Sequence, residues 1–335
     1  MKVSVVGCGN ISKCHFAALE KINDVEISSV VDIVPDRADT AAEKYNCKAY
    51  YDYLTMLDED KPDCVHICTP HYLHVDMAVE ALNRGINVLC EKPCAISAEG
   101  LKKLRLAQLM SQAQYGVCFQ NRYNYSTAVV KSIVEKETYG KIKTVRAIVD
   151  WERDEEYYSD DWHGQKAKEG GGVGVNQSVH TLDLMTYLIG KKYIKVTGHA
   201  FNDHLKDVIE VEDTICARYI FEDGIVALFN ATTGFGTNSA IIIDIFFEKA
   251  LVRIEGDDVY LIKENHSLER FEIDHGSKGE GKGYWGNGHL PLINDFYDCL
   301  VSDRKFPIDA IEGGKSVEQF LAVYESSETG NEIVF

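Results

Sequence analysis

A glycine-rich turn near the amino terminus has the spacing of a phosphate-binding loop. The segment Gly7-Cys8-Gly9-Asn10-Ile11-Ser12 directly follows the first apolar run and opens the first helical pattern. Gly7 permits a tight turn, Gly9 lets the backbone approach a pyrophosphate, and the helix start offers unpaired N–H groups to that anion. Ser12 replaces the third glycine of the usual pattern, and its small side chain still allows the helix to pack closely on a sheet.

A carboxylate follows the second apolar run, where a dinucleotide-binding fold holds a ribose. Asp32 lies 23 residues after Gly9, and it can accept hydrogen bonds from both ribose hydroxyls while repelling a 2′-phosphate. The sequence therefore favours NAD and disfavours NADP, although Arg37 could pair with a phosphate or lie over an adenine. A structural turn with a surface aspartate is the alternative. On the first interpretation, the cofactor contacts Gly7, Gly9, Asn10, Ile11, Asp32, Ile33 and Arg37.

Two further motifs end later strands of the same half of the chain, namely Cys68-Thr69-Pro70-x3-His74 and Glu91-Lys92-Pro93. With the glycine turn they occur in order, and the whole chain resembles the glucose–fructose oxidoreductase / inositol 2-dehydrogenase / MocA family. The resemblance implies an NAD-binding Rossmann domain at 1–119. It also implies an α/β domain with a large open sheet at 120–335, which binds substrate and forms homodimers or homotetramers. Further cofactor contacts implied by it are Thr69, Pro70, His74, Glu91, Lys92 and Asn121.

Lys92 is the first residue to which the resemblance gives a chemical role. It follows a predicted parallel strand at its carboxyl end, where such folds bind ligands. Its ammonium group can hydrogen-bond a substrate hydroxyl and stabilise the alkoxide character that develops as hydride leaves. Family members often have a cis peptide bond between the positions of Lys92 and Pro93. An ordinary surface lysine is the alternative.

His180 is the second such residue. The glycine run 170–174 leads to a predicted helix on which Asn176, His180 and Asp183 share one face. An imidazole is a suitable base for an alcohol proton near neutral pH. A lone helical histidine is more often structural, but the resemblance assigns His180 a catalytic role.

Position 176 departs from the inositol dehydrogenase pattern. Inositol-type members carry aspartate four residues before this histidine, whereas this sequence has Asn176. Asparagine can bind a hydroxyl, but it cannot act as a base or hold a proton. The departure argues against myo-inositol oxidation. The pattern Asn-Gln-x-x-His is more similar to the branch acting on sugars and nucleotide sugars, including 3-dehydrogenases of UDP-N-acetylglucosaminuronate.

Aromatic and planar polar side chains flank these residues. They suit a polyhydroxylated ring, which has apolar C–H faces and a hydroxyl rim, although a surface loop with anchoring aromatics is the alternative. The expected substrate contacts are Lys92, Arg122, Arg153, Tyr158, Trp162, Asn176, His180 and Asp183. His289 is a further candidate, whereas His15, His66, His199 and His275 are expected to be structural or solvated.

The elements that must position these residues change in character along the chain. In residues 1–119, short apolar runs alternate with helical patterns, which is typical of a parallel sheet covered on both faces. The runs are Lys2–Val6, Glu26–Val31, Cys64–Cys68, Ile86–Cys90 and Tyr115–Phe119, and helices are predicted over residues 35–45 and 98–112 among others.

Longer β-rich runs dominate after Gly140 and predict a mostly antiparallel sheet. They are Ile142–Trp151, Ile194–Phe201, Val211–Phe221, Ile225–Ala231, Ala240–Phe247 and Leu251–Ile254. Two late helices follow, and Ser316-x-x-Gln319 has the spacing of a capping box at the start of the second one.

Composition narrows the class of partner. The 335 residues contain 35 Lys and Arg and 53 Asp and Glu, for a formal net charge of −18. Such a chain is repelled by nucleic acid and by anionic membranes. No apolar stretch approaches the ~20 residues of a membrane-spanning helix, and the first residues lack the features of a signal peptide. Ten cysteines without a CxxC motif indicate reduced, mostly buried thiols and no metal site, so we expect a cytoplasmic protein.

Three hypotheses for function follow. The leading one is an NAD(P)-dependent dehydrogenase that oxidises a secondary hydroxyl of a sugar or sugar derivative, with His180 as general base and Lys92 orienting the hydroxyl. The second is a non-catalytic regulator that senses the cofactor, and such a protein has no need of the proton-handling pair. The third is an enzyme that retains its cofactor and shows no net redox change, which sequence does not distinguish from the first.

Overall fold

The computed structural model describes residues 1–263, 265–273 and 287–335, so His275 and the neighbouring Tyr284 and Trp285 lie outside the described part. The chain divides into two compact units. The first unit comprises residues 1–120 and 287–314, and the second comprises the described residues of 121–276 together with 315–335.

The first unit is built on a six-stranded sheet in which every paired strand is parallel. The strand order is β3-β2-β1-β4-β5-β6. The strands are β1 (Lys2–Val6), β2 (Glu26–Val31), β3 (Lys48–Tyr50), β4 (Cys64–Ile67), β5 (Asn87–Cys90) and β6 (Tyr115–Val117). Because every residue of β4 is buried, the apolar runs are covered on both faces. The predicted Rossmann-like parallel sheet is therefore confirmed.

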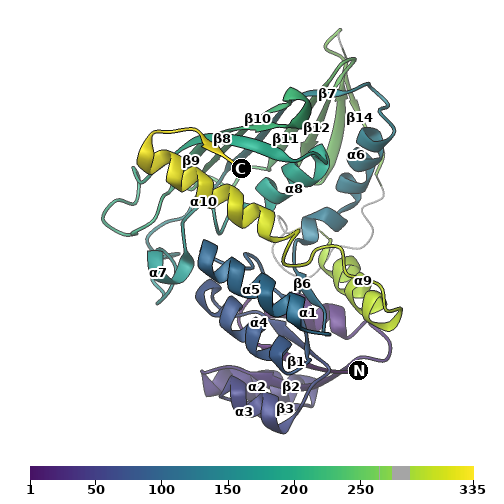
Figure 1. Cartoon of the computed structure of the whole chain (residues 1–335), viewed down its shortest axis with the longest axis vertical. Helices are drawn as coiled ribbons and strands as arrows, with labels where there is room; N and C mark the ends of the chain where they lie inside the picture. Colours follow the sequence, from purple (N-terminus) through teal and green to yellow (C-terminus); the bar gives the residue numbers. More distant parts are fainter. Residues whose placement is uncertain (264, 274–286) are drawn as a thin grey trace. The chain divides into compact units, whose positions relative to one another are not determined.

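Helices connect these strands and cover the sheet (Figure 1). They are α1 (Ser12–Leu19), α2 (Pro35–Tyr45), α3 (Tyr53–Glu59), the short η1 (His71–Leu73), α4 (His74–Asn83), α5 (Ala98–Met110) and α9 (His289–Val301).

The late helix α9 belongs to this unit, although the sequence analysis placed it in a second domain of 120–335. It packs against α1, and the rings of Phe296 and Phe306 lie so close to Gly116 that a Cβ there would be 2.8 Å from Phe306. The apolar face of α9 thus completes the core of the first unit.

The second unit contains a nine-stranded mixed sheet of order β14-β13-β12-β11-β7-β10-β9-β8-β15. Only the pairing of β7 with β10 is parallel among the described strands, which confirms a mostly antiparallel sheet. The strands are β7 (Ile142–Asp150), β8 (Tyr193–Phe201), β9 (Thr214–Phe221), β10 (Val226–Thr232), β11 (Ile242–Phe247), β12 (Leu251–Glu255), β13 (Asp258–Ile262), β14 (Leu268–Arg270) and β15 (Ile333–Val334).

Two helices lie along one face of this sheet (Figure 1), α8 (Val179–Ile189) and α10 (Gly314–Thr329). Val323 of α10 packs at Gly198, where a Cβ would lie 2.7 Å from it, and Ser326 Oγ accepts a hydrogen bond from Gly198 N. The remaining helices are η2 (Gln120–Tyr123), α6 (Tyr125–Glu135), α7 (Lys166–Glu169) and the short η3 (Glu222–Gly224). Within the described residues, none of the helices has both the length and the apolar character that crossing a bilayer requires.

Candidate active site

The glycine turn of the first unit leaves room at the start of α1. Gly7 has a φ of +90°, and a Cβ there would lie 2.7 Å from the carbonyl oxygen of Cys68. A Cβ on Gly9 would meet no atom within 4 Å. Ser12 Oγ donates to the Gly9 carbonyl at 2.7 Å, so the serine fixes the turn without filling it. The backbone N–H groups at the start of α1 can therefore be approached closely by an anion.

Asp32 ends β2 and is tied to the glycine turn. Its Oδ2 accepts from Cys8 N at 2.8 Å and its Oδ1 accepts from Val34 N at 2.9 Å. Each carboxylate oxygen has a second lone pair, so the side chain can still accept from ribose hydroxyls. Ile33, which is 84% exposed, and the exposed Arg37 follow it and are open to a cofactor. Asn10 is exposed and accepts from Lys13 Nζ, and Ile11 is the N-cap residue of α1.

His74 joins the two later motifs of the first unit. It is fully buried, and its ring nitrogens lie 2.8 Å from the carbonyl oxygens of Thr69 and Pro93. Burial lowers the pKa of His74, and the bonds to the two carbonyls oppose that shift. The Lys92–Pro93 peptide bond is cis, and Lys92 is partly exposed. His74 therefore holds the Thr69-Pro70 turn against the Lys92-Pro93 turn, while Lys92 can reach a ligand.

Glu91 is buried in a hydrogen-bonded chain. His15 Nε2 lies 3.0 Å from Glu91 Oε1, His15 Nδ1 lies 2.8 Å from His66 Nδ1, and His66 Nε2 lies 2.8 Å from Tyr297 Oη. Burial raises the pKa of Glu91, but the hydrogen bond and charge of His15 outweigh it and hold that pKa well below its usual range. Burial also keeps the pKa of His66 well below its ordinary value. The Glu91 side chain, expected at the cofactor, instead supports the strand end beneath Lys92.

His289 lies in the same core. Its ring centroid is 6.3 Å from that of His15, and burial lowers its pKa to about 4. Donor atoms of His15, Glu91 and Cys118 lie within 4.8 Å of one another. Because His15 and Glu91 bond each other directly, we assign these three residues to packing of the core and not to a metal.

The glycine run of the second unit is held by a second buried carboxylate. Glu212 Oε2 accepts from Gly172 N and Oε1 from Gly174 N, each at 2.9 Å, and Oε1 also accepts from Tyr324 Oη at 2.7 Å. Burial raises the pKa of Glu212, while these hydrogen bonds oppose the shift. A Cβ on Gly172 would lie 1.8 Å from the Glu212 carbonyl oxygen. Glycine is therefore required here, and the run delivers the chain to α8 along a fixed path.

His180 is the second residue of α8 and is partly exposed. The helix is anchored one turn later, where Arg122 Nε and Nη2 donate to the two carboxylate oxygens of Asp183 at 2.7 and 2.6 Å. Both side chains of this ion pair are buried, and Arg122 also lies over the Tyr187 ring. Arg122 and Asp183, expected to contact substrate, are thus engaged with each other and hold η2 against α8.

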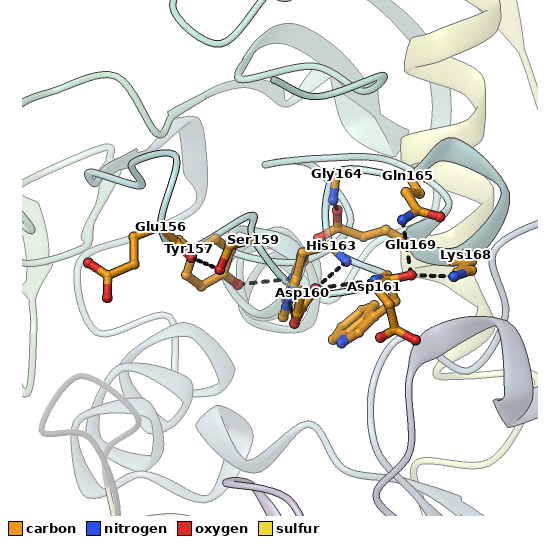
Figure 2. Close-up of polar contacts among 12 residues, drawn as sticks. Glu156, Tyr157, Ser159, Asp160, Asp161, His163, Gly164, Gln165, Lys168 and Glu169 are labelled. Carbon is orange, nitrogen blue, oxygen red and sulfur yellow. Dashed lines mark hydrogen bonds and ion pairs between the residues drawn. The ribbon is translucent and has the colours of Figure 1, made fainter. Parts of the chain in front are cut away.

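Asn176 lies in the turn before α8, because the helix begins at Val179 and not at the predicted position. Its Nδ2 donates to Glu169 Oε1 at 2.6 Å and contacts Tyr157 Oη at 3.3 Å. Gln177 Nε2 also donates to Tyr157 Oη, at 3.2 Å. Figure 2 shows this loop, with the Glu169 carboxylate turned toward the backbone of Gly164, whose N–H it accepts at 2.5 Å.

The aromatic residues of this loop divide between core and site. Tyr158, which was expected at the substrate, is buried in an apolar cluster with Leu205, Ile209 and Val211. The neighbouring Tyr157 instead bonds the Asn176 and Gln177 amides. Sequence reasoning missed Tyr157 as a contact because adjacent tyrosines give no signal for which one turns inward.

Arg153 and Trp162 flank the same loop. The Arg153 guanidinium lies over the rings of Trp151 and Tyr157, and Nη1 donates to Asn238 Oδ1 at 2.8 Å. Trp162 is partly exposed and stacks on His163, with ring centroids 3.7 Å apart. Both side chains are therefore held in fixed orientations and remain open to a ligand.

Buried polar atoms without protein partners indicate where a ligand can bind. Asn121 Oδ1 and Gln177 Oε1 are buried and accept no hydrogen bond from any residue that the structure describes. Buried acceptors normally have partners, so these atoms fit a molecule that brings N–H or O–H donors. NAD and a sugar both do so, and the open glycine turn with Asp32 fits a dinucleotide as well.

Comparison with known families agrees with this geometry. Residues 1–119 match the family described as "Oxidoreductase family, NAD-binding Rossmann fold", and residues 127–253 match the GFO/IDH/MocA C-terminal domain. The chain belongs to the Gfo/Idh/MocA family. It is therefore an NAD-binding oxidoreductase of a family that includes sugar dehydrogenases.

Several relatives are similar along nearly their whole length. D-glucoside 3-dehydrogenase of Escherichia coli is 23% identical, over 99% of this chain and 97% of its own. 2,7-Anhydro-N-acetylneuraminate hydratase of Mediterraneibacter gnavus is 24% identical, over 94% of this chain and 87% of its own. The crystal structure of the WlbA dehydrogenase of Bordetella pertussis, in complex with NADH and UDP-GlcNAcA, is 27% identical with a TM-score of 0.86. That match covers 100% of this chain and 98% of WlbA.

The position of Asp32 in this Gfo/Idh/MocA protein predicts its cofactor preference. We expect Asp32→Asn to lower kcat/KM for NAD about tenfold and to raise it for NADP, because one charge-assisted acceptor and one repulsion are lost together. Initial rates with both cofactors measure the change.

Asp32 also bonds Cys8 N and Val34 N, so the thermal midpoint is recorded in parallel. Asp36→Asn, which changes an exposed carboxylate in the first turn of α2, serves as the matched control. An NAD/NADP preference equal to that of the wild type would argue against the role of Asp32.

Proposed function

We propose that this protein is an NAD-dependent dehydrogenase that oxidises a secondary hydroxyl of a sugar or sugar derivative. The observation that carries the proposal is the Asn176-Gln177-x-x-His180 segment, which the glycine run and Glu212 hold in place and which presents a partly exposed imidazole. The surrounding aromatic and amide groups suit a polyhydroxylated ring. Relatives named for 3-dehydrogenation of sugars make a ring 3-hydroxyl the first position to test.

In the proposed mechanism, His180 accepts the proton of the substrate hydroxyl. Lys92 donates a hydrogen bond to the same oxygen and stabilises its developing negative charge. Bound NAD supplies the acceptor for the hydride. The hydroxyl proton and the hydride together account for the two hydrogens that the carbinol loses as it becomes a ketone.

One alternative keeps the same residues but gives no net oxidation. The relative named as a hydratase is as similar as the sugar dehydrogenase, and its name describes addition or removal of water. A retained cofactor that is reduced and reoxidised in one cycle is compatible with such a reaction. The non-catalytic regulator is disfavoured because it has no need of Lys92 together with His180.

The test is nicotinamide absorbance when the purified protein and NAD meet free sugars, cyclitols, sugar acids and UDP-sugars in turn. A rise with one class supports the dehydrogenase and identifies the substrate class. No rise with any class, despite measurable NAD binding, contradicts it. Cofactor released by denaturing the purified protein would then favour the retained-cofactor enzyme over a regulator.

We also propose a homodimer or homotetramer that forms through the open face of the nine-stranded sheet. On β10, Ala227 and Phe229 are buried, whereas Leu228 between them is 41% exposed, and Phe246 on β11 is 51% exposed. Leu228 lies in register with Arg146 of β7, which forms ion pairs with Asp244 across the same face. An apolar and charged surface of this kind suits contact with a second copy of the chain.

Replacing Leu228 with glutamate is therefore expected to produce a monomer, because it buries an unpaired charge at the interface. Size-exclusion chromatography with light scattering measures the mass. Val301→Glu is the control, since Val301 is 81% exposed on α9. If the Leu228 variant keeps the mass of the wild type, this face does not form the interface.

A further inference from the structure

The amide of Asn176 is oriented by its neighbours. Its Nδ2 group lies 2.6 Å from Glu169 Oε1 and 3.3 Å from Tyr157 Oη, so both N–H bonds of the amide have acceptors within the loop. The amide oxygen Oδ1 is then the atom through which Asn176 can accept a hydrogen bond from a hydroxyl. Asn176 is partly exposed, whereas Glu169 is completely buried.

Glu169 is itself fixed by the loop that it closes. Its second oxygen accepts from Gly164 N at 2.5 Å, and the residue ends the short helix α7 directly before the glycine run. A buried carboxylate with both oxygens already accepting hydrogen bonds has a fixed position and a fixed polarity. The group opposite it at position 176 must therefore be a donor.

We propose that Glu169 is a positioning residue that makes position 176 an uncharged acceptor for a substrate hydroxyl, and that residues 169 and 176 are functionally coupled. The proposal rests on the sugar dehydrogenase function proposed above. It follows that aspartate at position 176 is incompatible with glutamate at position 169. Two carboxylates at this separation cannot both be ionised, so changing Asn176 alone does not give an inositol-type site.

Other titratable and charged groups surround this pair. Glu169 acts electrostatically on the hydroxyls of Tyr157, Tyr158 and Tyr324. Arg153 and His163 lie against the Tyr157 ring, and Glu212 accepts from the Tyr324 hydroxyl. All of these groups are retained in the variants below, so differences among the variants report on positions 169 and 176.

The test is an exchange of polarity in four proteins: the wild type, Asn176→Asp, Glu169→Gln and the double variant. The double variant restores one donor and one acceptor, because a glutamine amide at position 169 can donate to a carboxylate at position 176 and still accept from Gly164 N. Glu156→Gln, an exposed carboxylate of the same loop, is the matched control. Two quantities are measured in each protein, the thermal midpoint and kcat/KM with the substrate found in the absorbance screen, both at about pH 6 and about pH 8.

We expect Asn176→Asp to lower kcat/KM about 100-fold at the higher pH and less at the lower pH, where the two carboxylates share a proton. Glu169→Gln loses one hydrogen bond and is expected to lower kcat/KM about tenfold. The double variant should return to within about tenfold of the wild type and lose the pH dependence of the Asn176→Asp variant. Equal or greater loss in the double variant, compared with the product of the single losses, would overturn the proposal.

The thermal midpoint separates this proposal from the proposed function. The lower midpoint of Asn176→Asp at the higher pH, and its recovery in the double variant, need no substrate. If this recovery is seen but no sugar is oxidised by the wild type, the function fails and the coupling stands. If sugars are oxidised but the midpoints and rates show no recovery, the coupling between positions 169 and 176 is wrong.

Discussion

Replacing His180 with alanine is expected to lower kcat about 10²–10⁴-fold, the usual contribution of a general base. The affinity for NAD should stay nearly unchanged, because the residues that fit the cofactor's pyrophosphate and ribose, Gly9 and Asp32, belong to the first unit. The fall should appear equally in kcat and in kcat/KM, since the proton transfer matters only in the transition state. Steady-state rates and NAD titration by fluorescence measure the two effects.

His199→Ala is the control for this prediction. His199 is exposed on β8 of the same unit, so its loss should leave kcat and NAD affinity as they are in the wild type. A second variant, His180→Gln, keeps a polar side chain that can hydrogen-bond but cannot serve as a base. If the glutamine variant keeps wild-type turnover, His180 positions the substrate and another group accepts the proton.

The arrangement of the first unit was predictable because its signals are local. Each apolar run of residues 1–119 that was predicted as a strand lies on a strand of the parallel sheet. The glycine turn and Asp32 lie at the carboxyl ends of β1 and β2, where their spacing predicted them. Turn chemistry and strand ends depend on a few neighbouring residues, so sequence contains that information.

The contacts that hold the second half of the site were not predictable in the same way. Glu212 bonds Gly172 across 40 residues of chain, and nothing in the sequence around either residue indicates that contact. Ser316 and Gln319 had the spacing of a capping box, yet both are buried within α10, and Gln319 hydrogen-bonds Thr186 of α8. In each case a long-range partner decides the role of the side chain, and one sequence does not specify that partner.

The same reason explains the substrate residues that were reassigned. Arg122 and Asp183 have the residue types of a sugar-binding pair, but they satisfy each other in a buried bidentate contact. Asn176 and His180 were predicted on one helix face, whereas the bonds from Ser178 to Val173 keep the segment before Val179 in a turn. The chemical identity of the site residues was therefore readable, and their partners were not.

Replacing Lys92 with methionine is expected to lower kcat about 10²–10³-fold, which is the cost of removing one donor that stabilises a developing oxyanion. Methionine keeps most of the length and the apolar stem of the side chain. The support beneath position 92, formed by Glu91 with His15 and by His74 with Pro93, should persist. The thermal midpoint and NAD affinity should therefore stay close to those of the wild type.

Two further variants separate charge from geometry at position 92. Lys92→Arg retains the positive charge but replaces a compact ammonium with a planar fork, so it should recover only part of the activity. Lys102→Met, at an exposed lysine of α5 in the same unit, should have no effect. If Lys92→Met raises KM and leaves kcat unchanged, then Lys92 binds substrate and transition state equally well. In that case the alkoxide must be stabilised elsewhere, and the assignment of Lys92 to the chemical step fails while the role of His180 remains.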